Sequence, residues 1–189
     1  LFASFGFSEG LIRYVSWYRG RKELKKIKYL FNLTVFVSVF SGIFLEILLF
    51  FLSDVIAINV FKNSSLATFL KIFAFLIPFY LINNLFLSVL QGFEKIGWYS
   101  FISNIFHNII KVFFLIIFVL MGLKTNAITF SYFIGTLAMF FFSYLICRYK
   151  IPELLKNFIL EKNTKKKIKK EFIAYSWPLL FSVAVSEIF

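Results

Sequence analysis

The sequence has very few of the residues that build disulfides, metal centres and acid–base sites. Its 189 residues contain one cysteine, one histidine and nine acidic residues, and Asp54 is the only aspartate. A single cysteine excludes an internal disulfide and any CxxC site, and a single histidine excludes a multi-histidine metal site within this segment. No glycine-rich phosphate loop is present either. We therefore expect no catalytic residue, no metal and no cofactor within these residues.

Apolar residues, by contrast, are abundant. Hydrophobic residues make up 60% of the chain and charged residues only 16%, a composition that a soluble domain of this size could not bury. Four apolar runs have the length of about 20 residues that a helix needs to cross a bilayer. These runs are Tyr29–Leu52, Leu66–Leu90, Trp98–Met121 and Ala127–Cys147. The sequence thus predicts an all-α, polytopic transmembrane helical bundle.

Two partial helices flank these four. Leu1–Tyr18 is apolar enough for the last part of a membrane helix, and Phe172–Phe189 begins a further apolar helix. We therefore expect the chain to be a fragment of a larger, transporter-sized protein. The predicted parts are an N-terminal transmembrane bundle (1–147), a cytoplasmic amphipathic helix and basic linker (148–171), and the start of a second bundle (172–189).

Basic residues are concentrated in two blocks, 19–28 and 148–171, which hold 15 of the 21 lysines and arginines. An even number of crossings places both blocks on one face, and the positive-inside rule assigns that face to the cytoplasm. This predicts a multi-pass protein of the cytoplasmic membrane. Because orientation explains the net charge of +12, we expect membrane lipids and no nucleic acid as partners.

The second basic block has a pattern of its own. Pro152 stands at a favourable helix start, and the apolar residues that follow it fall on one face, which predicts an interfacial amphipathic helix. The polar tract Glu161–Lys170 is then a linker between two helical bundles. Its lysines either bind acidic lipid headgroups or only set the topology.

Polar residues follow one face of the third apolar run. Their spacings of three and four place them within one helical stripe that begins at the cytoplasmic end and stops near the centre. The stripe consists of Gly97, Ser100, Asn104, His107, Asn108 and Lys111. It predicts half of a helix that lines a water-filled cavity open to the inside, and the alternative is a polar seam between packed helices. Asn84 lies on a similar, shorter face of the second run.

Positive charge exceeds negative charge within the predicted membrane helices. Lys111 lies near the middle of its helix, where an uncompensated charge is expensive. Arg13 either pairs with Glu9 four residues away or points into the cavity, and Glu46 is a candidate partner for Lys71 near the outer helix ends. A cavity with such cations suits an anion such as lipid-linked pyrophosphate. We therefore predict Arg13 and Lys111 as substrate contacts, and Asn84, Ser100, Asn104, His107 and Asn108 as cavity lining.

The segment Ser8–Lys28 resembles the polysaccharide-unit flippases of the multidrug/oligosaccharidyl-lipid/polysaccharide superfamily. Their second helix typically ends in the pattern G-L-x-R-x-V-S-x-Y-x-G-x-G before a basic loop. In this chain Gly10, Leu11, Arg13, Val15, Ser16, Tyr18 and Gly20 match, while Lys22 replaces the later glycine. Pro78–Gly97 and Tyr175–Leu180 also look similar to family segments. The resemblance implies that the chain runs from the end of helix two to the start of helix seven.

The resemblance further implies a two-bundle, alternating-access transporter for polysaccharide biosynthesis. Such proteins move isoprenoid-pyrophosphate-linked oligosaccharide from the inner to the outer leaflet, and a coupling ion is possible. Three alternatives remain open: a cation-coupled drug exporter of the same superfamily, a membrane glycosyltransferase or polymerase with catalytic residues outside this fragment, and a non-transporting membrane scaffold. A cation-exporting site would want buried carboxylates, which makes the drug exporter the second choice.

Overall fold

The chain forms an all-α membrane bundle. The computed structural model describes residues 6–123, 126–156 and 160–188, and these ranges contain helices and no β-strand. Four helices are long and apolar enough to cross a membrane. The first, Leu24–Val60, consists of α2 (Leu24–Val55) and the π-helix η2 (Ile56–Val60), and the second is α3 (Ser65–Gly92). The third, Ile96–Leu120, consists of α4 (Ile96–Ser100), the π-helix η3 (Phe101–Phe106) and α5 (His107–Leu120). The fourth is α6 (Asn126–Lys150). These four match the four predicted apolar runs, which confirms the predicted multi-pass fold.

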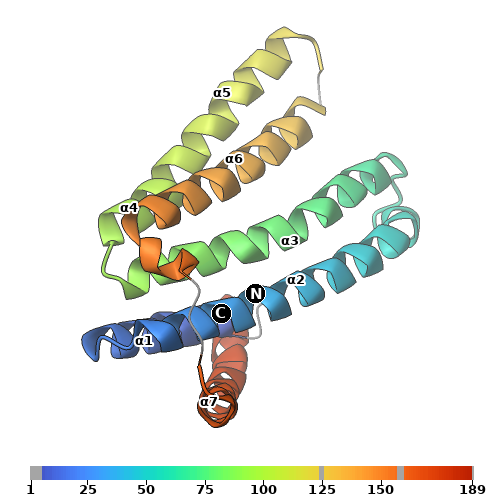
Figure 1. Cartoon of the computed structure of the whole chain (residues 1–189). Coiled ribbons are helices and arrows are strands. Elements are labelled where there is room, and N and C mark those ends of the chain that lie inside the picture. Colours follow the sequence, from blue (N-terminus) through green and yellow to red (C-terminus); the bar gives the residue numbers. More distant parts are fainter. Residues whose placement is uncertain (1–5, 124–125, 157–159, 189) are drawn as a thin grey trace.

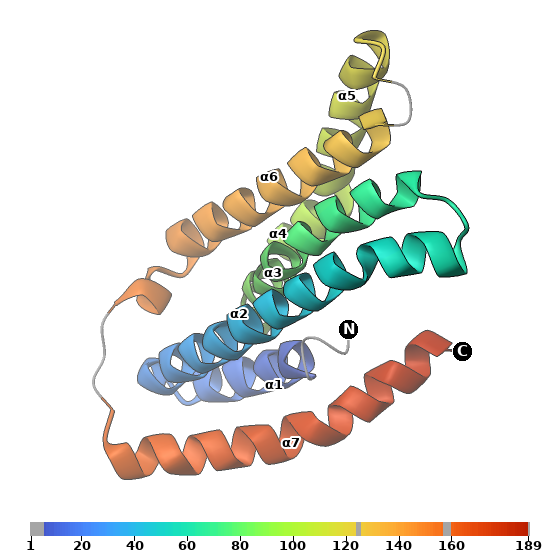
Figure 2. The ribbon, with the colours of Figure 1, turned by 90° about the vertical axis from the view of Figure 1, so that its right-hand side faces the viewer.

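The central helix of the bundle is α3. Figure 1 shows α2 and α3 as one antiparallel hairpin and α5 and α6 as a second. α3 packs against α2, α6 and the short helix α1 (Phe7–Gly20), while α7 (Lys162–Ile188) packs against α1, as the view in Figure 2 also shows. Every residue from Leu85 to Leu90 is buried, because helices cover this part of α3 on several sides.

Small and polar side chains hold the helices around α3 together. Gly42 of α2 lies so close to Pro78 that a Cβ at Gly42 would stand 2.9 Å from the Pro78 Cα. On the other side, the Ser143 hydroxyl of α6 donates a hydrogen bond of 2.7 Å to Oδ1 of Asn83, and both residues are buried. Close backbone approach and interhelical hydrogen bonds replace the hydrophobic effect as the driving force for packing inside a membrane.

Both basic blocks lie at the same end of the bundle. Arg19 at the end of α1 forms an ion pair with Glu94 in the turn after α3. The hydrogen bond and charge of Arg19 lower the pKa of the Glu94 carboxyl below its usual value. Lys28 donates to the backbone carbonyl of Leu154, which joins the first basic block to the second. These contacts agree with the prediction that an even number of crossings returns the chain to one face.

The prediction of an amphipathic helix after Pro152 is wrong for the residues that the structure describes there. The structure has only a short 3₁₀ helix, Pro152–Leu155 (η4), after which Lys156 is extended. The reason is that Ile151 and Leu154 are buried in the bundle instead of facing a membrane surface. Residues 157–159, which carry the rest of the predicted apolar face, lie outside the described residues.

The predicted linker Glu161–Lys170 is also different in the structure, because α7 already begins at Lys162. Lysine is a good helix former, and this stretch continues directly into the apolar part of α7. Ile168 anchors the basic part of the helix, since its side chain is buried. The boundaries of the three predicted parts of the chain stay predictions.

The turn between α1 and α2 contains a residue in the left-handed region. Lys22 has a φ of 59° and an exposed side chain. It stands where the flippase pattern has its later glycine. Glycine adopts this conformation freely, whereas for a residue with a Cβ it costs about 1–2 kcal/mol of conformational free energy. The glycine of the pattern therefore has a conformational reason, and Lys22 occupies a strained position.

Lys22→Gly is expected to raise the stability of the protein by about 1 kcal/mol, because it removes this strain. Thermal unfolding of the full-length protein in detergent would measure the change. Lys169, an exposed lysine inside α7, provides a matched control. Lys169→Gly should lower the stability by about 1 kcal/mol, since glycine is unfavourable inside a helix. A loss of stability in both variants would contradict the prediction.

Candidate functional site

A polar cavity of about 630 Å³ lies between α1, α3, α6 and the helix Ile96–Leu120. It exists because α5 packs closely on α6, whereas α3 contacts the preceding short helix α4. The lining on the α1 and α3 side is Gly6, Ser8, Glu9, Ile12, Tyr80, Leu81, Asn84, Leu87, Ser88 and Gln91. The opposite side contributes Tyr99, Ser103, His107, Lys111, Tyr132 and Met139. The cavity thus extends from the middle of α3 towards the end of the bundle that carries the basic blocks.

Lys111 supplies the positive charge of this cavity. Its Nζ lies 4.7 Å from the ring centroid of Tyr132, within reach of a cation–π contact. Its aliphatic stem lies over Gly135, where a Cβ would come within 2.5 Å of the Lys111 Cγ. None of the ion pairs among the described residues includes Lys111. A lysine that is not neutralised by a carboxylate is a binding group for an anion.

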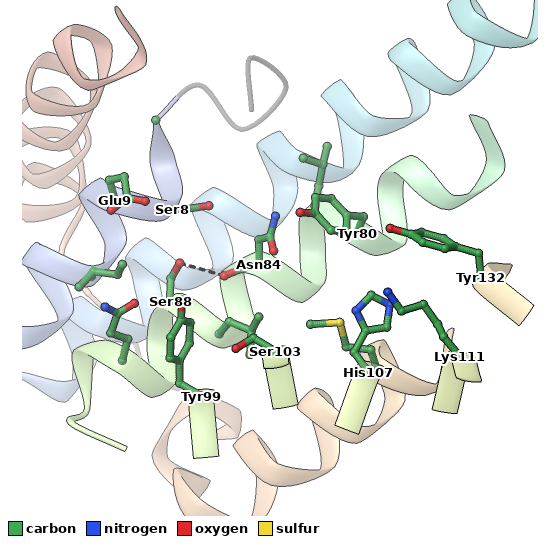
Figure 3. Close-up of a pocket in the computed structure, with 16 residues that line it drawn as sticks. Ser8, Glu9, Tyr80, Asn84, Ser88, Tyr99, Ser103, His107, Lys111 and Tyr132 are labelled. Carbon is green, nitrogen blue, oxygen red and sulfur yellow. Dashed lines mark hydrogen bonds between the residues drawn. The ribbon is translucent and has the colours of Figure 1, made fainter. Parts of the chain in front are cut away.

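His107 lies one helical turn before Lys111, on the same wall (Figure 3). Its Nε2 is buried and has no hydrogen-bond partner among the described residues. Its ring makes an edge contact with Tyr132 at a centroid distance of 6.0 Å. A buried polar nitrogen without a partner is costly, so this atom is available to a water molecule or a ligand in the cavity.

The two charged ends of the cavity are well separated. Figure 3 shows Glu9 and Ser8 from α1 at one end and Lys111, His107 and Tyr132 at the other, with Asn84 of α3 between them. Glu9 is exposed. The cavity therefore has an acidic residue, Glu9, at one end and a basic residue, Lys111, at the other, with polar side chains between them. This arrangement favours an elongated polar ligand whose anionic group lies beside Lys111.

The structure brings three of the predicted site residues together and leaves the others outside. Asn84, His107 and Lys111 line the cavity. Ser100, Asn104 and Asn108 form a separate ladder, in which Asn108 donates to the Asn104 carbonyl at 2.7 Å and Asn104 donates to the Ser100 hydroxyl at 3.3 Å. Both asparagines are exposed.

The π-helix Phe101–Phe106 accounts for the difference at Asn104. A π-helix has i to i+5 hydrogen bonds and holds more residues per turn than an α-helix, so it shifts the register of the stripe. The cavity face consequently runs through Tyr99, Ser103, His107 and Lys111 at intervals of four. With the α-helical period, the sequence predicts Asn104 in the cavity lining, whereas in the structure Ser103 lines the cavity.

Arg13 does not share the cavity with Lys111. It lies on the face of α1 that meets α7, with its guanidinium carbon 4.2 Å from the ring centroid of Tyr175. A second pocket of about 520 Å³, lined by Arg13, Tyr14, Trp17 and Glu171, adjoins this contact. The predicted pair with Glu9 is not among the ion pairs of the described residues.

Comparison with protein families gives a match over the whole chain. Residues 1–189 match a family described as "Polysaccharide biosynthesis protein". The chain belongs to this family. Its members are flippase-like membrane proteins, so the match confirms the resemblance seen in Ser8–Lys28 and its extent along the chain. Comparisons with curated proteins and with solved structures find no match.

The family match and the four apolar helices support a multi-pass membrane transporter related to polysaccharide biosynthesis. Among the described residues of this family member, no three side chains of His, Cys, Asp or Glu gather at one point. The cavity offers a ligand the charge of Lys111 and the hydrogen-bonding groups of its polar side chains.

Sequence reasoning missed the tyrosines of this family member's cavity. Tyr80, Tyr99 and Tyr132 all line it. Each lies in a long apolar run with phenylalanines nearby, where a tyrosine is easily taken for one more apolar ring. A buried tyrosine hydroxyl usually finds a hydrogen-bond partner, which makes a tyrosine in such a run a candidate for the lining of a polar cavity.

Lys71, which like Lys111 lies inside an apolar run of a membrane helix, is outside the cavity. It forms an ion pair of 2.9 Å with Asp54, near the end of the bundle opposite the basic blocks. The proposed pairing with Glu46 is therefore wrong, and the partner is Asp54, which lies about two turns beyond Glu46 on α2. Lys111 is left as the lysine that serves the cavity.

Proposed function

We propose that this chain forms the N-terminal part of a flippase that moves isoprenoid-pyrophosphate-linked oligosaccharide from the inner to the outer leaflet by alternating access. The observation that carries the proposal is the polar cavity with Lys111 in it, in a member of a polysaccharide biosynthesis family. The pyrophosphate binds at Lys111 by a charge-assisted contact, which is stronger than a neutral hydrogen bond. Asn84 and His107 offer further polar contacts nearby.

The proposed orientation follows from charge. The end of the bundle where Arg19 and Lys28 contact the turns after α3 and α6 faces the cytoplasm of the cell that makes the glycan. The cavity lies in the half of the membrane near that end, where a lipid-linked sugar assembled in the cytoplasm would enter. The protein belongs in the cytoplasmic membrane in this proposal. The headgroup role of Arg13 stays a prediction, because Arg13 faces α7.

A second candidate function rests on Glu9. This carboxylate lines the cavity at the end opposite Lys111. A carboxylate in a membrane cavity is a binding group for a proton or a metal cation, as cation-coupled export of a drug requires. The same residue would serve as a coupling site in the flippase. An ion requirement of transport therefore does not separate the two candidates, whereas the identity of the transported substrate does.

The experiment that tests the proposal is translocation by the reconstituted full-length protein. Liposomes would carry a fluorescent polyprenyl-pyrophosphate oligosaccharide, and a membrane-impermeant quencher would report which leaflet holds it. We expect protein-dependent movement between leaflets, with protein-free liposomes as the baseline. Absence of movement by the folded protein, with and without an ion gradient, would reject the flippase. Export of a cationic dye by the same liposomes would favour the drug exporter.

A further inference from the structure

An apolar cavity lies beside the polar cavity and shares the helices α3 and α6 with it. It has a volume of about 450 Å³, within the usual range of ligand sites. Its walls come from three helices and carry no charged residue. They include Leu45, Leu48 and Leu49 of α2, Phe73 and Ile77 of α3, and Thr136 of α6. This apolar cavity offers an occupant neither a charge nor a row of hydrogen-bond donors.

The apolar cavity adjoins the polar cavity directly. Tyr80, Leu81 and Tyr132 line both of them. Along α3, the apolar lining runs from Phe73 to Leu81, and the polar lining continues from Tyr80 to Gln91. On α3 the two cavities therefore follow each other, the polar one nearer the basic end and the apolar one farther from it.

Two tyrosines mark the border between the cavities. A tyrosine has an apolar ring and a polar hydroxyl, so it suits a position with an apolar environment on one side and a polar one on the other. Tyr132 also carries the Lys111 ammonium over its ring at 4.7 Å. The positive charge of the polar cavity consequently lies at the border itself, and an anion bound there has the apolar cavity as its neighbour.

We propose that the apolar cavity holds part of the isoprenoid chain of the same lipid whose pyrophosphate binds at Lys111. This inference rests on the proposed function and adds a place for the lipid tail. In this ligand a sugar, an anionic pyrophosphate and an uncharged hydrocarbon chain follow one another. Along α3 the polar cavity is followed by the apolar cavity, and Lys111 of α5 lies at their border beside Tyr132, which gives the same order.

The alternative occupants of the apolar cavity are bulk phospholipid and another part of the same protein. Lipid chains are as apolar as leucine, so hydrocarbon alone gains little by leaving the bilayer for this cavity. A substrate tail differs from a bulk lipid because its headgroup is held at Lys111, next to the border. Occupancy by the substrate tail should therefore depend on headgroup binding, and occupancy by bulk lipid should not.

Photo-crosslinking in the full-length protein tests this dependence. Leu48 and Ile47 are neighbours on α2 with exposed fractions of 43% and 51%, and of the two only Leu48 lines the apolar cavity. Leu48→p-benzoylphenylalanine and the matched control Ile47→p-benzoylphenylalanine would be reconstituted with radiolabelled polyprenyl-pyrophosphate oligosaccharide. We expect labelling at position 48 several-fold above position 47. An unlabelled analogue with the same headgroup and a short chain should abolish the difference. Leu49, which also lines the cavity, replaces Leu48 if that variant does not fold.

Two results would overturn the inference. Equal labelling at positions 47 and 48, unaffected by the short-chain analogue, would show that the cavity holds bulk lipid. A crosslink from position 48 to a peptide of the same protein would show that protein covers the cavity. Tyr99→p-benzoylphenylalanine, in the polar cavity, separates this failure from failure of the proposed function. Labelling at 99 without labelling at 48 rejects only the tail site, whereas labelling at neither position rejects both.

Discussion

Lys111→Ala is expected to lower the translocation rate of lipid-linked oligosaccharide by about one to two orders of magnitude. The variant removes the lysine charge of the cavity, and a hydrogen bond to a charged group contributes about 1.5–3 kcal/mol. Because the Lys111 ammonium has no ion pair among the described residues, no carboxylate there is left unpaired by the change. The leaflet assay on reconstituted liposomes would measure the rate.

Lys71→Ala is the matched control for the Lys111 variant. It also removes a lysine from a membrane helix, but one that already pairs with Asp54 outside the cavity. We expect its rate to stay close to that of the unchanged protein. Equal rates for Lys111→Ala and the unchanged protein, at equal expression, would remove Lys111 from the site and leave the family membership intact.

Gly135→Val provides a second test that leaves the charge in place. The new side chain would collide with the Lys111 stem, because a Cβ at position 135 already lies 2.5 Å from Cγ and 3.6 Å from Cδ2 of His107. The lysine must then move away from Tyr132. If the position of the ammonium matters as much as its presence, transport falls in this variant as well.

Gly92→Ala is expected to destabilise the bundle by about 1–3 kcal/mol. An added Cβ would stand 2.7 Å from Cγ1 of Val15, 2.8 Å from its Cβ and 3.1 Å from the carbonyl oxygen of Ile12. Val15 is fully buried and cannot retreat. The same contact carries a hydrogen bond of 3.2 Å from the Ser16 hydroxyl to the Gly92 carbonyl, so α1 would be pushed away from α3.

Gly97→Ala serves as the control for the Gly92 variant. Gly97 lies five residues farther along the chain, in α4, and a Cβ there would meet no atom within 4 Å. Alanine is favoured over glycine in a helix, so this variant should be as stable as the unchanged protein or more stable. Thermal unfolding of both variants in detergent would measure the difference. Equal midpoints would show that α1 and α3 are not in close contact at Gly92.

The parts of the fold that were predictable follow from local physical requirements. A helix needs about 20 apolar residues to cross the bilayer, and runs of that length, such as Leu66–Leu90, can be recognised in the sequence. The meeting of the two basic blocks at one end follows from the even number of crossings. Lys111 stood out for the same kind of reason, because a charge near the centre of an apolar run needs a polar surrounding.

The parts that were not predictable depend on how the helices meet. Arg13 has the same sequence signal as Lys111, yet it faces Tyr175, because α1 is short and α7 covers that side. The π-helix Phe101–Phe106 has no clear sequence mark, and its wider turn moves Asn104 out of the predicted stripe. Ile151 and Leu154 form an apolar pattern that suits a membrane surface equally well, and only packing shows that they are buried in the bundle.

The sequence by itself determined that this protein is a helical membrane bundle, where its spans lie and to which family it belongs, because chain length, charge and motif act residue by residue. Only the tertiary structure decided which polar residues share a cavity. It joins Lys111 and His107 to Asn84 and Tyr132 across three helices, and it places an apolar cavity beside them. The physical reason is that a helix stripe is a local property, whereas a binding cavity is the space that remains when several helices cannot all be in contact at once.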